Sequence, residues 1–317
     1  MEDPDLPLGT SRRAAVDLSF MRYDNILQTI GKTPLVRIQR IWRDPEIEIW
    51  AKLEGCNPMG SVKERPALWI VEAAEKDGSL TRGMTLLESS SGNTGIGLAL
   101  VGAVKGYPVT IVMPQKVSVE RRKILRALGA EIVFTSEKGG SDEAWDIAER
   151  LDRENPGKYF YARQYFNINN TLSHYDATAL EIWEDMEHDL DVAAITLGTC
   201  GTIMGLSMRL KELNPHIRIV AIEPQVKHTQ QGLRNMDESR VPALLDWSRI
   251  DEKVVVSDTD AYHYARLLVR EEGIFAGISS GTAMAGAIEV AHKMKRGKIV
   301  TLFPDRAEKY LTTSLFE

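Results

Sequence analysis

The sequence predicts an α/β fold with two domains, each a parallel sheet between two layers of helices. Strand-like and helix-like segments alternate along the chain, which is typical of βαβ units. The strand-like segments are nearly continuous apolar runs, as in 191–198 (DVAAITLG), and this indicates parallel strands buried on both faces. A length of 317 residues exceeds the usual size of one domain and favours two.

Strands are predicted where apolar and β-branched residues form short runs between turn residues. In chain order these segments are 47–55, 84–89, 107–114, 131–136, 158–165, 191–198, 217–224 and 298–305. Residues 225–257 contain scattered Gly, Pro, Asp and Ser, so we expect irregular structure there.

Helices are predicted where apolar residues recur three or four positions apart between capping residues. One helix begins with Ser61 and Glu64, which have the spacing of a capping box, and stops at Gly78. The other helical segments are 96–106, 118–130, 141–153, 173–186, 204–214, 260–273 and a last one that follows the turn 276–281 and runs to Met294.

The composition excludes several classes of function. A net charge of −6 provides no positive surface for nucleic acid, and no polybasic block suits a membrane surface. No apolar run approaches the roughly 20 residues that span a bilayer, and residues 1–22 lack the apolar core of a signal peptide. Cys56 and Cys200 make neither a disulfide framework nor a metal motif. We expect a soluble cytoplasmic protein with a loosely held arm at 1–22.

Lys63 is the first candidate catalytic residue. It lies in the first turn of the helix that opens at Ser61, beside the positive end of the helix dipole. An ammonium group is disfavoured there, so we expect Lys63 to lose its proton more readily than a surface lysine. A free amine is what carbonyl chemistry requires. The alternative is a solvated lysine beside a helix start.

Three loops have a composition that suits anions. Residues 90–95 (SSGNTG) and 198–202 (GTCGT) each follow a strand and open a helix, where backbone N–H groups bind carboxylates or phosphates; 277–281 (GISSG) is the third. Neither of the first two is a dinucleotide fingerprint or an ATP-binding P-loop. Each loop alone is most often a turn with a helix cap. Together with Lys63 they indicate a pyridoxal phosphate enzyme that acts on an amino acid.

Four motifs in this order, NPMGSVKERP, SSSGNTG, LGTCGTIMG and EEGIFAGISSG, resemble the cysteine synthase family of fold-type-II pyridoxal-phosphate enzymes, whose fold is like that of tryptophan synthase β. The resemblance runs from about Asp24 to the C-terminus. It implies that Lys63 carries the cofactor, that Asn93 contacts the pyridoxal O3′ and that Ser279 faces the pyridine nitrogen. It also implies a phosphate site at Gly198, Thr199, Cys200, Gly201 and Thr202, and a substrate carboxylate site at Ser90, Ser91, Gly92, Thr94 and Gln164.

The same resemblance implies the reaction and the domain plan. An O-activated L-serine would lose its β-substituent to give an α-aminoacrylate, and a sulfur nucleophile would add to form L-cysteine. A smaller, mobile domain at 57–165 would be inserted into a larger one made of 23–56 and 166–317, with the cofactor between them. The family implies a homodimer.

The activated serine is the open question, and Arg234 bears on it. The segment 230–246 (QQGLRNMDESRVPALLD) resembles a branch that uses O-phospho-L-serine and takes sulfur from a small carrier protein. Arg234 matches the arginine that reads the phosphate there, and a guanidinium suits such a dianion. Alternatively, Arg234 is a surface loop residue and the substrate is O-acetyl-L-serine, as in B-type enzymes, with serine acetyltransferase as an expected partner.

Other functions and several departures from the family pattern stay open. Cystathionine β-synthase or another β-substituted alanine synthase would use the same residues with a different nucleophile, and a catalytically weak homologue would act as a binding partner. Glu64 replaces the usual Asp, and 304–310 (PDRAEKY) differs from the common SDSGERY. Cys200 is read as a small filler rather than a nucleophile, and His174 as a structural histidine.

Overall fold

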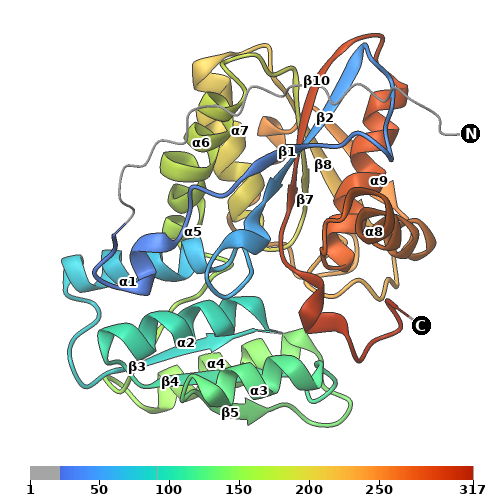
Figure 1. Cartoon of the computed structure of the whole chain (residues 1–317). Coiled ribbons are helices and arrows are strands. Elements are labelled where there is room, and N and C mark those ends of the chain that lie inside the picture. The colour runs from blue at the N-terminus through green and yellow to red at the C-terminus, as the bar shows by residue number, and fades with distance from the viewer. Residues whose placement is uncertain (1–21, 91, 317) are drawn as a thin grey trace, which may run out of the picture.

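Two β-sheets organise the computed structural model, which describes residues 22–90 and 92–316 (Figure 1). The larger sheet has the strand order β1-β2-β10-β7-β8-β9, and the smaller has the order β5-β4-β3-β6. Residues 1–21 of the expected N-terminal arm, and Ser91, lie outside the described residues. The strands are β1 Leu35–Arg37, β2 Ile47–Leu53, β3 Thr85–Ser89, β4 Val109–Met113, β5 Glu131–Phe134, β6 Tyr159–Tyr161, β7 Val192–Thr196, β8 Arg218–Pro224, β9 Glu252–Val256 and β10 Gly297–Phe303.

The larger sheet is parallel except at one edge, where β1 pairs antiparallel with β2. Its central strands bury both faces, as their apolar runs predict. On β7, Val192 and Ala194 face one core with the helices α8 (Asp258–Glu272) and α9 (Ile278–His292). Ala193 and Ile195 face the other core, with α6 (Ala179–Asp185) and α7 (Gly201–Leu213).

The smaller sheet is entirely parallel and has the same three-layer plan. The helices α1 (Glu64–Asp77), α2 (Asn93–Lys105) and α3 (Val119–Ala127) share one core with it, and α4 (Ser141–Glu154) covers the other face. Figure 1 shows α1 at the junction of the two halves, close to the short helix α5 (Ile168–Ser173). The predicted α/β class with parallel sheets is confirmed.

Three local predictions were wrong. Residues 252–256 lie within the segment expected to be irregular, yet they form β9, because pairing with β8 completes the sheet edge. The segment 173–186 is not one regular helix, because a π-helical turn at His174–Thr178 separates α5 from α6. The turn 276–281 largely belongs to α9, which begins at Ile278. In the part of the chain that is described, no helix is long and apolar enough to cross a membrane.

Candidate active site

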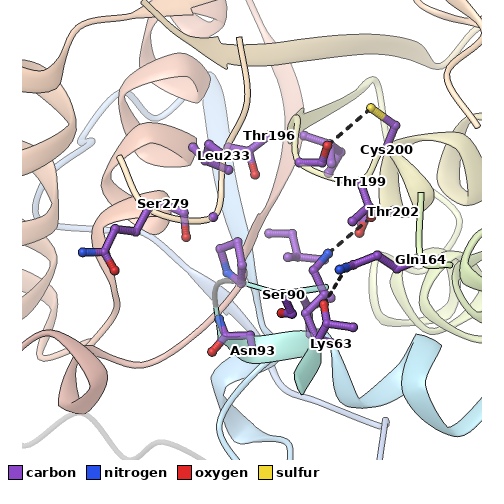
Figure 2. A pocket seen from close by; sticks show the side chains of 18 of the residues that line it. Lys63, Ser90, Asn93, Gln164, Thr196, Thr199, Cys200, Thr202, Leu233 and Ser279 are labelled. Carbon is purple, nitrogen blue, oxygen red and sulfur yellow. Dashed lines mark hydrogen bonds between the residues drawn. The ribbon is translucent and has the colours of Figure 1, made fainter. Parts of the chain in front are cut away.

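A pocket lies where the carboxyl ends of strands from both sheets meet, the expected place for a ligand in parallel α/β folds. Figure 2 shows side chains from both halves pointing into it. Residues after β3 line one side, residues after β7 line another, and the start of α9 closes it. The predicted site residues that line it are Lys63, Ser90, Asn93, Thr94, Gln164, Gly198, Thr199, Cys200, Thr202 and Ser279.

Lys63 sits at the N-cap of α1, one residue before the first turn in which it was predicted. The expected capping box is formed in part: the backbone N–H of Ser61 donates to Glu64 Oε1 over 2.8 Å, while Ser61 Oγ accepts from the backbone N–H of Lys63 over 3.3 Å. The Nζ of Lys63 lies 3.5 Å from Oγ1 of Thr199. Burial lowers the pKa of Lys63 to about 8, although Cys200 and Asp305 oppose this shift. The lysine therefore loses its proton far more readily than an ordinary lysine, and about a tenth of it is free amine at pH 7.

The loop 198–202 forms a cradle at the N-terminus of α7, whose first N–H groups have no partner within the helix. A Cβ on Gly201 would collide with the side chain of Asn170, and one on Gly198 would lie 2.9 Å from the carbonyl oxygen of Gly232. Asn170 Nδ2 donates to Thr199 Oγ1 over 2.9 Å. Cys200 adopts a left-handed backbone with φ of 67° and is buried, which raises the pKa of its thiol to about 12. A protonated thiol suits the reading of Cys200 as a filler.

His174 lies beneath this cradle on the π-helical turn and is fully buried. Its Nε2 is 3.2 Å from Thr202 Oγ1, and its Nδ1 is 2.9 Å from Thr178 Oγ1. Burial, together with the charges of Arg65 and Lys63, lowers the pKa of His174 well below its usual value, so the ring is neutral. A neutral ring that donates to Thr202 through Nε2 leaves that hydroxyl hydrogen free for an anion in the cradle. His174 is thus a structural histidine that supports the cradle.

The residues expected to bind the substrate carboxylate lie across the pocket from the cradle, beside the N-terminus of α2. Thr94 Oγ1 donates to Gln164 Oε1 over 2.6 Å, and Gln164 Nε2 donates to the carbonyl oxygen of Ser89 over 3.0 Å. Ser90 Oγ accepts from the backbone N–H groups of Gly92 and Gly95. Gly92 is required because a Cβ there would lie 2.5 Å from Cδ of Arg121. Ser91, the other expected member, lies outside the described residues.

Glu88 supports this site from below and was not among the predicted residues. It is fully buried on β3 and accepts from the backbone N–H groups of Ser89 at 2.8 Å and Gln164 at 3.0 Å. Burial raises the pKa of Glu88 to about 7, against the effect of these hydrogen bonds. The sequence feature that could have indicated Glu88 is that it is the only acidic residue in the apolar run 84–89.

Asn93 and Ser279 both line the pocket and come from different helices (Figure 2). Ser279 lies in the first turn of α9, and Asn93 is the first residue of α2. Asn93 contacts Asp305 and Lys309, which belong to the segment 304–310 that differs from the family pattern. Sequence reasoning did not assign a role to these two residues, to Arg121 or to Tyr310, although Arg121 and Tyr310 both line the pocket.

Arg234 does not line the pocket that holds Lys63. It lines an adjoining groove, and the two cavities share Tyr165, Gln231, Gly232 and Leu233. The guanidinium carbon lies 4.6 Å from the ring centroid of Tyr165, and Nη2 donates to the Tyr165 hydroxyl over 3.2 Å. Asp142 is its nearest carboxylate, at 3.8 Å. Arg234 is therefore a largely buried cation next to the pocket, with a weak ionic partner.

This pocket defines a class of enzyme. An amine of lowered pKa stands beside an anion cradle, and this suits a cofactor that carries both an aldehyde and a phosphate. Pyridoxal phosphate fits the donor set: the N–H groups that open α7 have no partner within the helix, and Asn93 and Ser279 supply further polar groups to the pocket.

Comparisons with known proteins support the assignment to pyridoxal phosphate enzymes. The family model for pyridoxal-phosphate dependent enzymes matches residues 26–305. A cysteine synthase of Aquifex aeolicus is 42% identical over 301 residues, which cover 92% of this chain and 92% of that protein. Cysteine synthase B of Pseudomonas aeruginosa is 38% identical over 297 residues, 94% of this chain and 99% of that protein. The crystal structure of a cysteine synthase from Entamoeba histolytica matches with a TM-score of 0.89 and 39% identity, over 94% of this chain and 92% of that one.

The chain therefore belongs to the pyridoxal-phosphate-dependent enzyme family, and several of the relatives it resembles there are cysteine synthases. The predicted family, fold type, cofactor and cysteine-forming transferase activity are confirmed.

Proposed function

We propose that this chain forms L-cysteine by β-replacement on O-phospho-L-serine, with Lys63 as the residue that binds the cofactor and moves the α-proton. The observation that carries the proposal is the lowered pKa of Lys63 together with its position, 3.5 Å from Thr199 in the anion cradle. When bound, pyridoxal phosphate supplies an electron sink that makes the α-proton and the β-substituent of an amino acid easier to remove.

Residues of the chain would transfer the proton, bind the substrate carboxylate and contact the pyridine nitrogen. A free Lys63 amine would accept the α-proton at Nζ and return it after the nucleophile adds, which requires a pKa near neutrality. Thr94, Gln164 and Ser90 would bind the substrate carboxylate, helped by the N–H groups that open α2. Ser279 would face the pyridine nitrogen with a hydroxyl, which is too weak an acid to protonate it, so the electron sink stays moderate.

Arg234 supports a phosphorylated substrate over an acetylated one. It is 8% exposed, its ionic partner Asp142 is 3.8 Å away, and the groove that it lines opens onto the pocket at 231–233. A dianionic phosphate would offer this guanidinium a stronger and bidentate partner. O-acetyl-L-serine is the alternative, and it would leave Arg234 as a groove residue held by Tyr165.

The domain plan belongs to the same proposal. Closure of the domain at 57–165 on the substrate carboxylate would exclude water from the pocket. Thr94 and Gln164 lie on this domain, whereas the cradle lies on the larger one, so substrate binding would draw the two together. We also propose a cytoplasmic homodimer that takes sulfide, or sulfur from a carrier protein with a C-terminal thiocarboxylate.

The test is a side-by-side absorbance titration of the purified holoprotein with O-phospho-L-serine and O-acetyl-L-serine. The proposal expects the visible cofactor band to change at lower concentrations of phosphoserine. A preference for acetylserine would favour the alternative substrate, and a protein without a cofactor band would contradict the enzyme assignment. Competition with homocysteine as nucleophile separates cysteine formation from a cystathionine β-synthase.

A further inference from the structure

The segment 304–310 after β10 joins the parts of the chain that carry Lys63 and Ser279. The backbone N–H of Val62 donates to the carbonyl oxygen of Pro304 over 2.8 Å, next to Lys63. The backbone N–H of Gly277, just before α9, donates to the carbonyl oxygen of Asp305 over 3.0 Å. This segment is therefore part of the frame of the pocket, although no side chain in it was predicted to have a role.

Two buried charges of this segment hold the side chain of Asn93. Asn93 Nδ2 donates to Asp305 Oδ2 over 2.7 Å, and Lys309 Nζ donates to Asn93 Oδ1 over 3.0 Å. Asp305 is 2% exposed and Lys309 is 4% exposed, so both bonds are shielded from water. Lys309 Nζ also donates to the carbonyl oxygen of Gly60 over 3.1 Å, and Tyr310 donates to Asp305 Oδ2 over 2.7 Å.

These two charges allow only one orientation of the Asn93 amide. A flipped amide would place its oxygen against the carboxylate of Asp305 and its NH2 group against the ammonium of Lys309, and both contacts would be repulsive. In the observed orientation Asp305 takes one of the two amide hydrogens. The other hydrogen on Nδ2 remains available, and Asn93 lines the pocket.

We propose that Asp305 and Lys309 are positioning residues that fix the Asn93 carboxamide so that its second N–H is directed at the ring hydroxyl oxygen of the cofactor. The proposal rests on the proposed role of Asn93 toward the pyridoxal O3′. The ammonium of Lys309 draws electron density from the amide through Oδ1 and makes the free N–H a stronger donor, whereas Asp305 fixes the direction of that N–H. Asp305 and Lys309 thereby tune cofactor affinity and absorbance without touching the substrate.

The test compares cofactor binding in variants of the two residues. Lys309→Met removes the ammonium and Asp305→Asn keeps the size of the side chain, so both are expected to fold, as checked by thermal unfolding. Each should weaken binding of pyridoxal phosphate to the apoprotein by about tenfold and shift the visible absorbance maximum of the holoprotein. Lys309→Arg should restore most of the affinity. The neighbouring exposed change Glu308→Gln is the matched control and should leave both readouts unchanged.

A double-mutant cycle with Asn93→Ala separates positioning from general stabilisation of the segment. If Asp305 and Lys309 act through Asn93, Lys309→Met should have no further effect on affinity or absorbance in the Asn93→Ala background. Full additivity would overturn the proposal, as would wild-type affinity and absorbance in both single variants. If Asn93→Ala itself left the cofactor unchanged, the proposed role of Asn93 would fail first, so the two failures are distinguishable.

Discussion

The hydroxyl of Thr94 donates a 2.6 Å hydrogen bond to the side-chain oxygen of Gln164, 70 residues further along the chain. This bond joins the N-terminus of α2 to the loop after β6. It holds the side chains of Thr94 and Gln164 together at the carboxyl ends of strands β3 and β6. Gln164 is held in turn by Glu88 through its backbone N–H. The residues expected to bind the substrate carboxylate are thus joined by a short hydrogen-bond network that includes the buried acid Glu88.

Replacing Lys63 with alanine should abolish the visible band of the bound cofactor and reduce turnover by at least about a thousandfold, since one amine serves as anchor, base and acid. Absorbance spectroscopy and an assay of cysteine formation measure both effects. Lys76→Ala, an exposed lysine on the same helix, should change neither. A Lys63→Ala protein with an unchanged spectrum would refute the assignment.

Replacing Thr94 with valine should raise KM for the activated serine about tenfold or more and change kcat less, because it removes the hydroxyl that holds Gln164 in the expected carboxylate site. Steady-state kinetics measure the two constants. Thr312→Val is a control on an exposed residue of the C-terminal segment. An unchanged KM would place the carboxylate elsewhere.

Glu88 should make stability depend on pH in a defined direction. Its pKa in the folded protein is raised by burial to about 7, above the ordinary glutamate value, so its favourable contribution is complete at low pH and is lost as pH rises toward 7. We expect urea unfolding to show a fall of up to about 3 kcal/mol between pH 4.5 and 7 that is missing in Glu88→Gln. Equal pH dependence in both proteins would contradict the assigned pKa.

The rate of cofactor uptake should also depend on pH. Burial lowers the pKa of Lys63 to about 8, so the fraction of free amine grows up to that pH and then levels off. Stopped-flow absorbance of the apoprotein with pyridoxal phosphate should show a rate that rises about tenfold per pH unit below 8 and reaches a plateau above it. A rate that still rises from pH 9 to 10 would mean an unperturbed lysine.

Arg234→Ala should reduce turnover of O-phospho-L-serine about tenfold or more and leave that of O-acetyl-L-serine nearly unchanged, because only the first substrate carries a dianion. Arg240→Ala is the matched control, since Arg240 lies in the same segment but is exposed and paired with Asp146. Competition kinetics between the two substrates give the ratio directly. Equal losses with both substrates would remove Arg234 from substrate selection.

Features with a local signal could be predicted from the sequence. Lys63 and the loops 90–95 and 198–202 are marked by turn and capping residues beside apolar runs, and the structure brings them into one pocket. The strand β9 was missed because Glu252–Val256 is short and partly exposed at a sheet edge, and its pairing with β8 decides its conformation.

Contacts between residues far apart in the sequence could not be predicted, because no local pattern marks them. Asn93 meets Lys309 across 216 positions of sequence, and Arg121 stacks over Tyr310 with 4.9 Å between its guanidinium carbon and the ring centroid. From its local sequence alone, each of these residues would be interpreted as a surface residue. Lys309 and Tyr310 meet these residues only because the chain after β10 passes beside the pocket. The spacing of residues within a segment does not predict that path.

The lysine that binds the cofactor can be located directly by chemical trapping. The holoprotein is reduced with borohydride and digested, and the peptides are analysed by mass spectrometry. We expect a pyridoxyl group on the peptide that contains Lys63, with Lys309 unmodified. A pyridoxyl group on Lys309 or on any other lysine, or none at all, would contradict this expectation.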